Sequence, residues 1–203
     1  MILGPKLLLK LVKEKKLVEG LSKRELTNPE GAGFDLRLGE VYKISGEAFL
    51  GETERKTPDI ELVAKYEPKR TYRHSGKQRL HQNPDSGSLT RMTKTNSITF
   101  QPGDYFLVKT VESFNMPENL TANFKPRTTT FRSGLFLRTG NVAPGYKGPV
   151  TFGMKNEGPI AVTIEMGARF VHVQFEEVKG GGSNYRGQWQ GGRVSTTKKE
   201  VQI

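Results

Sequence analysis

The chain has 203 residues, 34% of them hydrophobic, with 23 glycines, 11 prolines and a formal net charge of +11. This length allows one domain with a sizeable core, and the turn-rich composition favours short strands over a helical bundle. The absence of cysteine and the three scattered histidines exclude disulfides, thiolate chemistry and a zinc site of the usual ligands.

The N-terminal segment predicts a packing helix and not a membrane anchor. Proline stands near its start, leucines recur on one face and Gly20 is a suitable stop, so we expect a helix from Pro5 to about Glu19. Lysines interrupt the leucines too early for a signal peptide, and no apolar run in the chain is long enough to span a membrane. We therefore expect a soluble, cytoplasmic protein.

Residues 31–39 read GAGFDLRLG, in which apolar and charged residues alternate between glycines. The alternation predicts a short strand with Phe34, Leu36 and Leu38 on one face. A buried aspartate needs a partner of opposite charge, so we expect an arginine from elsewhere in the chain to bind Asp35.

A basic block follows two further short strands, which we predict at residues 41–44 and 60–63. Residues 64–96 lack periodicity and predict an extended loop or hairpin insertion. Between residues 65 and 94 there are eight lysines and arginines against two acidic residues. Such a block either attracts nucleic acid or another polyanion by counterion release, or it is a solvated loop.

The C-terminal half alternates apolar and polar residues in short runs separated by turn signals. We predict strands at residues 98–100, 105–108, 150–154, 160–164 and 168–175. Several short strands at this spacing indicate a mainly β protein, a barrel or a sandwich, in a single domain over residues 1–178.

Residues 179–203 form a glycine-rich arm that we expect to be flexible. The arm carries Tyr185, Trp189 and two arginines. It is therefore either a disordered chain end or a segment that closes over a ligand and stacks on it.

The stretch from 126 to 148 carries the clearest binding signal. Its first residues supply guanidinium and hydroxyl donors without a competing negative charge, from Arg127, Thr128, Thr129, Thr130 and Arg132. Donors of this kind suit a polyphosphate. The alternative is a threonine-rich strand with two solvated arginines.

Taken in order, these segments resemble the dCTP deaminase and dUTPase superfamily. GAGFDLRLG is similar to the first motif of that family, PRTTTFRSGL to its G-R-S-S-x-x-R-x-G-L segment, and GNVAPGYKG to its third motif. MGARFVHVQF resembles a conserved strand of the family, and YRGQWQGGR resembles the deaminase tail. Each piece is short, but their common order makes the resemblance specific.

The resemblance implies a distorted, jelly-roll-like β-barrel with an N-terminal helix, assembled as a homotrimer with sites between subunits. It implies that the ligand is dCTP, dUTP or a related nucleotide, with Mg²⁺ bound through the triphosphate. The triphosphate would be held by Arg127, Thr128, Thr129 and Arg132, with Asp35 orienting an arginine. The base and sugar would be contacted by Thr139, Gly140, Asn141, Val142, Tyr146, Tyr185 and Gln188.

Two positions depart from the family pattern. The resemblance implies a catalytic aspartate in the dUTPase branch at the position where this chain has Ala143. It implies a catalytic glutamate in the deaminase branch at the position where this chain has Gly153. A general base must reach its water within hydrogen-bonding distance, and neither residue can serve. Glu157 is a weak candidate for a replacement, and the catalytic residue stays unknown.

Three functions remain open at this point. The chain is an enzyme of dCTP or dUTP metabolism with a base from another position, a catalytically inactive deoxynucleotide-binding or regulatory relative, or a nucleic-acid-binding protein that uses residues 65–94. The phosphate-binding residues are present while both catalytic carboxylates are missing, which favours nucleotide binding without catalysis. Membership of the family would instead favour an enzyme.

Overall fold

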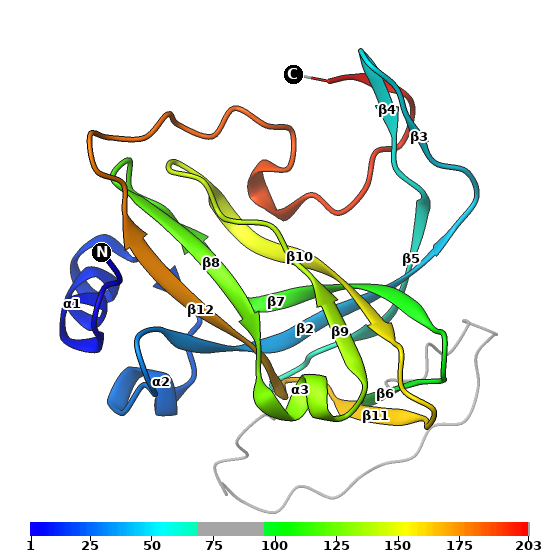
Figure 1. Cartoon of the computed structure of the whole chain (residues 1–203), viewed down its shortest axis with the longest axis horizontal. Helices are drawn as coiled ribbons and strands as arrows, with labels where there is room; N and C mark the ends of the chain where they lie inside the picture. Colours follow the sequence, from blue (N-terminus) through cyan, green and yellow to red (C-terminus); the bar gives the residue numbers. More distant parts are fainter. Residues whose placement is uncertain (69–95, 203) are drawn as a thin grey trace, which may run out of the picture.

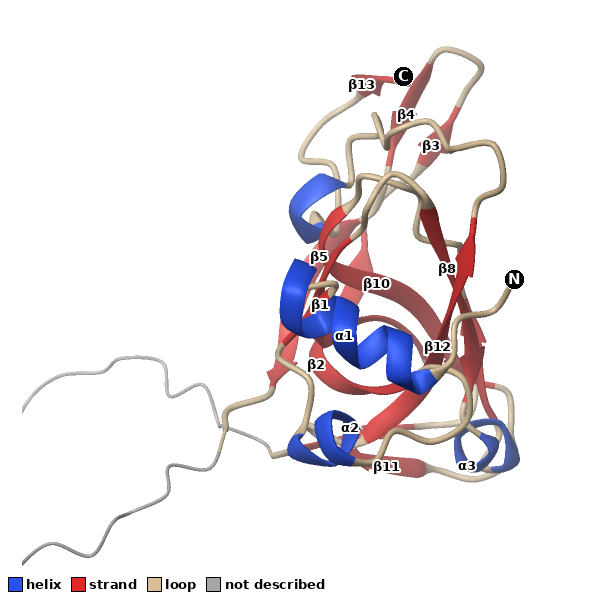
Figure 2. Ribbon diagram, turned by 90° about the vertical axis from the view of Figure 1, so that its left-hand side faces the viewer, coloured by secondary structure: helices blue, strands red, loops and turns tan. Residues whose placement is uncertain are grey.

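A computed structural model describes residues 1–68 and 96–202 of the chain. It has the predicted mainly β architecture, an eight-stranded antiparallel sheet that curls into a nearly closed barrel (Figures 1 and 2). The path of the sheet is β8 (Leu120–Pro126), β12 (Arg169–Glu177), β2 (Phe34–Ser45), β7 (Tyr105–Asn115), β10 (Lys147–Asn156) and β9 (Leu135–Arg138), with β1 (Val18–Glu19) beside β7 and β5 (Asp59–Lys65) beside β2.

Two small sheets and four short helices complete the described chain. One sheet pairs β11 (Val162–Glu165) with β6 (Ser97–Phe100), and the other orders β13 (Glu200–Val201), β4 (Glu54–Lys56) and β3 (Phe49–Leu50). The helices are α1 (Pro5–Lys15), α2 (Lys23–Thr27), α3 (Thr128–Arg132) and the 3₁₀ turn η1 (Gln190–Gly192). None of the helices in residues 1–68 and 96–202 is long and apolar enough to cross a membrane.

The barrel interior is filled by the apolar face of β2 and by phenylalanines from the opposite strands. Phe34, Leu36 and Leu38 are fully buried, which confirms the face predicted from their alternation. Phe124 contacts the ring of Phe152 edge to face, with ring centroids 4.8 Å apart. Burying a side chain of this size contributes about 1.5–3 kcal/mol, so this core holds the barrel together.

The first helix ends earlier than predicted. The expected end near Glu19 is wrong because α1 stops at Lys15, and Lys16 takes a left-handed conformation with φ 53°. The next two residues, Leu17 and Val18, are buried, and Val18 pairs with Phe114 of β7. Core packing of these two side chains therefore overrides the helical periodicity.

Other predictions of secondary structure also need correction. Strand β5 extends through Lys65, so the basic insertion does not begin at residue 64, and residues 69–95 lie outside the described part of the chain. Strand β11 begins at Val162 and not at residue 160. The threonine-rich strand that was one alternative for residues 128–132 is wrong, since these residues form helix α3.

The C-terminal arm returns along the barrel after β12. In Figure 1 the 3₁₀ turn η1 of the arm lies beside β10. The arm then continues to β4, with which β13 pairs antiparallel. The arm also buries Thr196, whose hydroxyl accepts a hydrogen bond from the backbone N–H of Thr57 at 2.9 Å. The expected mobility of this arm stays a prediction.

Candidate functional site

A cavity of about 430 Å³ lies between the C-terminal arm, strands β7 and β10, and the hairpin that precedes β10. Most of the residues predicted to contact base and sugar line this cavity: Gly140, Asn141, Val142, Tyr146 and Tyr185. Thr139 is exposed outside it, and Gln188 instead accepts a hydrogen bond from Arg55. The cavity therefore gathers residues from both the hairpin and the arm.

The hairpin is fixed to the barrel by backbone hydrogen bonds. Val142 bridges to Ala122 of β8, with its N–H donating to the Ala122 carbonyl at 2.8 Å and its carbonyl accepting at 3.1 Å. The N–H of Tyr146 donates to the Ala143 carbonyl at 3.3 Å, which closes a turn with proline second and glycine third. Gly145 has φ 74°, as the third position of a type II β-turn requires.

Two tyrosines join the hairpin to the arm. The ring of Tyr146 meets the ring of Tyr185 edge to face, with centroids 5.4 Å apart, and the N–H of Tyr185 donates to the Pro144 carbonyl at 2.7 Å. The Tyr146 hydroxyl donates to the Pro149 carbonyl at 2.6 Å. Burial, followed by the nearby Tyr185, raises the pKa of Tyr146 to about 12, so this phenol stays neutral at physiological pH.

A cluster that joins Trp189 and Arg193 of the arm to Arg55 of β4 and Glu200 of β13 holds the arm in place. Trp189, which lines the cavity, contacts two guanidinium groups: that of Arg55 lies 4.7 Å from its ring centroid and that of Arg193 lies 5.7 Å from it. Glu200 of β13 pairs with both arginines, at 3.2 Å from Arg55 and 2.8 Å from Arg193. More than 130 residues separate Arg55 from its partners, so no local pattern could predict this cluster.

Ala143 and Gly153, the two positions at which the resemblance implies a carboxylate, both line the cavity. Ala143 is in the hairpin turn and Gly153 is on β10. A Cβ atom on Gly153 would lie 2.1 Å from the hydroxyl oxygen of Tyr105, so the tyrosine fills the space where a side chain at 153 would begin.

The cavity wall offers no obvious general base. Among the described residues that line it, none is an aspartate, a glutamate or a histidine. Glu157, the weak candidate from the sequence, is outside the cavity, with its carboxylate 3.5 Å from the guanidinium of Arg138.

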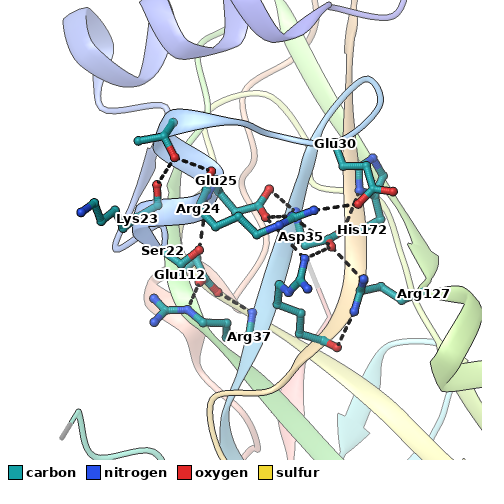
Figure 3. Close-up of polar contacts among 12 residues, drawn as sticks. Ser22, Lys23, Arg24, Glu25, Glu30, Asp35, Arg37, Glu112, Arg127 and His172 are labelled. Carbon is teal, nitrogen blue, oxygen red and sulfur yellow. Dashed lines mark hydrogen bonds and ion pairs between the residues drawn. The ribbon is translucent and has the colours of Figure 1, made fainter.

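The predicted phosphate-binding arginine lies in a separate, buried ion-pair network around Asp35 (Figure 3). The Asp35 carboxylate is 2.8 Å from Nε of Arg127 and 2.9 Å from Nη1 of Arg169, and Nδ1 of His172 is 3.0 Å away. The arginine partner expected for Asp35 is therefore present. These side chains come from β2, β12 and the end of β8, which the barrel brings together.

The network keeps Asp35 ionised. Burial alone would raise the pKa of Asp35, but the hydrogen bond with His172 and the charges of Arg127 and Arg169 outweigh it and lower the pKa. A second buried carboxylate, Glu25 of α2, accepts a hydrogen bond from the Asp35 backbone N–H at 3.0 Å. Arg127 is thus bound to Asp35 through its Nε, and Thr128 and Thr129, which follow it, are exposed.

The three threonines after Arg127 are not equivalent. Thr128 and Thr129 are exposed with Arg132 on α3, whereas Thr130 is buried and its hydroxyl donates to the Phe170 carbonyl at 2.8 Å. Thr130 is therefore structural. Neither Arg127 nor any of these α3 residues lines the 430 Å³ cavity of the same chain.

Comparisons with known proteins agree with the fold. The model of the dCTP deaminase-like family matches residues 2–178. A dCTP deaminase of Thermococcus kodakarensis is 30% identical over 109 residues, covering 53% of this chain and 70% of that protein. A probable deoxyuridine 5'-triphosphate nucleotidohydrolase of Methanothermobacter thermautotrophicus is 28% identical over 166 residues, covering 82% of this chain and 89% of that protein.

A solved structure shares the fold at lower sequence identity. The 2'-deoxycytidine 5'-triphosphate deaminase of Agrobacterium tumefaciens aligns with a TM-score of 0.59 and 14% identity. The alignment covers 88% of this chain and 49% of that one, so the chain spans about half the length of the Agrobacterium protein.

Proposed function

We propose that this chain, which belongs to the dCTP deaminase-like family, binds a pyrimidine deoxynucleoside triphosphate such as dCTP or dUTP and turns it over slowly or not at all. The observation that carries the proposal is the cavity, which is lined by hairpin residues 140–143 and Tyr146 and, across from them, by Gly153 of β10. A concave, mostly apolar pocket with a few polar groups is the usual form of a small-ligand site. Tyr146 packs on the sugar in this assignment, and Tyr185 covers it from the arm.

The loss of both carboxylates supports binding without rapid chemistry. General acid–base catalysis needs a group within about 2.6–3.2 Å of the proton it moves. Ala143 and Gly153 have no such group, and Glu157 is turned toward Arg138. The nucleotide would thus be held and released, as in a regulatory or storage role.

We assign the triphosphate to Arg127, Thr128, Thr129 and Arg132 of a neighbouring copy in a homotrimer. Support comes from the separation of these residues from the cavity of their own chain. The surface beside them also carries large apolar side chains, since Phe131 is 45% and Phe136 43% exposed. Adjacent exposed aromatic residues commonly mark an interface between subunits.

Magnesium enters this proposal only with the nucleotide. In residues 1–68 and 96–202, no group of three or more histidine or carboxylate side chains is placed to hold a metal ion. Mg²⁺ commonly binds through substrate phosphates and keeps several waters, so the protein needs no cage of its own. The charge of the bound ion would offset part of the triphosphate charge beside Arg127 and Arg132.

Calorimetric titration of the full chain with dCTP, dUTP and dATP, each with magnesium, tests the proposal. We expect saturable binding of the two pyrimidine nucleotides and weaker binding of dATP. Ala143→Trp would fill the cavity and abolish that binding, whereas Ala161→Trp, at an exposed position, would leave it unchanged. If the wild-type chain binds none of these nucleotides, the proposed function is wrong.

A further inference from the structure

The single histidine among residues 1–68 and 96–202 is His172, and it lies in the network around Asp35. His172 is on β12, the strand between β2 and β8, where it pairs with Asp35 on one side and with Lys125 on the other. Residues directly opposite each other on neighbouring strands have side chains on the same face of the sheet. A carboxylate, an imidazole and an ammonium group thus form a row across the three strands.

One nitrogen of the imidazole binds Asp35, which leaves the other to gain a proton. Nδ1 is 3.0 Å from Oδ1 of Asp35. Asp35, whose pKa is lowered, is ionised and can only accept, so Nδ1 of His172 carries the hydrogen. Nε2 lies over the backbone of Gly33, at 2.7 Å from where a Cβ atom would stand, so a residue larger than glycine would crowd it. The side chain of His172 is 20% exposed, and solvent can therefore exchange protons with the ring.

The two oxygens of Asp35 are divided between His172 and the arginines (Figure 3). Oδ1 faces Nδ1 of His172, whereas Oδ2 is 2.8 Å from Nε of Arg127 and 2.9 Å from Nη1 of Arg169. The hydrogen bond from His172 therefore fixes the carboxylate in the orientation in which Oδ2 holds Arg127. Without this donor the carboxylate could turn, and Arg127 would lose its fixed position.

The charged groups around the imidazole come close to balance while it is neutral. Besides Asp35 of β2, they are the carboxylates of Glu25 and Glu30, from α2 and the loop after it, and the cations of Arg24, Lys125, Arg127 and Arg169, from α2, β8 and its end, and β12. Four cations against three carboxylates leave one positive charge while His172 is neutral, and two once it is protonated. Protonation therefore makes the surroundings of Arg127 more attractive to a polyanion.

Resting on the proposed function, we infer that His172 is a positioning residue for the triphosphate, which holds Asp35 toward Arg127 and gains a proton as the triphosphate binds. A protonated imidazole adds positive charge near Arg127, so the triphosphate binds the protonated form more tightly. By linkage, binding then favours protonation, and affinity falls as the pH rises. Histidine is the side chain whose charge ordinarily changes between pH 5 and 8, so the effect belongs to that range.

Titration calorimetry of the full chain with dUTP and magnesium, in two buffers of different ionisation enthalpy, counts the protons taken up on binding. Uracil has no amino group to protonate, and titration of the terminal phosphate is common to all variants. His172→Asn keeps an N–H donor for Asp35 but cannot gain charge. From pH 8 to pH 6 the affinity of the wild type should rise roughly fivefold more than that of His172→Asn, with an uptake larger by about a third of a proton. His74→Asn and His81→Asn, the same change at the other two histidines, should match the wild type.

A second comparison tests the positioning of Asp35 separately from the charge. At pH 8, His172→Leu, which removes the donor to Asp35, should bind dUTP roughly fivefold more weakly than the wild type, and His172→Asn should recover most of this loss. Three results would each overturn the inference and leave the proposed function standing. These are equal proton uptake by the wild type and His172→Asn, loss of the uptake in His74→Asn or His81→Asn instead, and full affinity of His172→Leu. A wild-type chain that does not bind dUTP at any of these pH values overturns both.

Discussion

The hydroxyl of Tyr105 occupies the space in which a side chain at Gly153 would begin, 2.1 Å from the position of a Cβ atom. Gly153 does not adopt a left-handed backbone, so the obstacle to a larger residue there is Tyr105 and not the local conformation. The two positions are on adjacent antiparallel strands and are coupled by the register of β7 and β10. A side chain at position 153 and the present placement of Tyr105 therefore exclude each other.

This coupling predicts that Gly153→Glu alone will not restore deamination of dCTP. The glutamate would overpack against the Tyr105 ring and destabilise the protein by about 1–3 kcal/mol. Gly153→Glu combined with Tyr105→Ala opens the space and should recover stability and some deamination. Thermal unfolding and separation of dCTP from dUTP measure the two effects. Equal stability of the single variant and the wild type would contradict the coupling.

Ala143→Asp tests the other position at which the resemblance implies a catalytic carboxylate. Ala143 lines the cavity from the hairpin turn, so an aspartate there faces the bound nucleotide without disturbing β10. A positioned general base contributes typically 10²–10⁴-fold, so hydrolysis of dUTP should rise well above the wild-type rate. Ala161→Asp, at an exposed position, is the matched control and should stay at that rate. No gain from Ala143→Asp would mean that this position does not face the reacting phosphate.

Arg127→Ala should weaken nucleotide binding by tenfold or more. Charge-assisted hydrogen bonds to phosphate contribute about 1.5–3 kcal/mol each. Asp35 keeps Arg169 and His172 as partners, so the assembly should survive the change. Titration calorimetry and light scattering measure affinity and assembly. The control Arg138→Ala removes an exposed arginine that pairs with Glu157, and unchanged affinity in both variants would remove Arg127 from the phosphate site.

The ion pairs of Glu40 predict that the protein loses stability in acid, whether or not nucleotide is bound. Burial would raise its pKa, but hydrogen bonds with Lys109, Tyr42 and Lys65 lower the pKa from 4.5 to about 2. Because the folded pKa is below the unfolded one, this contribution is complete above pH 4.5 and is lost as the pH falls toward about 2.

Urea unfolding across this pH range measures the effect. The free energy of unfolding of the wild type should fall by roughly 1–2 kcal/mol more than that of Glu40→Gln, less than the full shift implies because water reaches the lysines. Parallel pH profiles for the two proteins would show that the ion pairs do not stabilise the fold.

The sequence predicted those parts of the molecule that follow from local pattern. The alternation of Phe34, Leu36 and Leu38 gave the apolar face of β2, and the family motifs gave the barrel and the hairpin of the cavity. The buried position of Asp35 in a strand also predicted an arginine partner. Each of these inferences needs only residues close together in sequence or a shared order of motifs.

Long-range register decided what the sequence could not predict. The contact of Tyr105 with Gly153 depends on which residues of β7 and β10 face each other, and a tyrosine near a turn gives no sign of it. The cluster of Arg55, Trp189 and Glu200 depends on β13 returning to β4. The early end of α1 at Lys15 likewise reflects the burial of Leu17 in the core.

The most direct test of the account is product analysis at saturating nucleotide. The wild-type chain is incubated with dCTP or dUTP and magnesium, at concentrations where calorimetry shows the nucleotide bound, and the products are resolved over time. Bound nucleotide recovered unchanged, with turnover at least about 10²-fold below 1 s⁻¹, is the predicted result. Turnover at about 1 s⁻¹ or faster would contradict the account and would mean that a carboxylate outside the described cavity wall supplies the base.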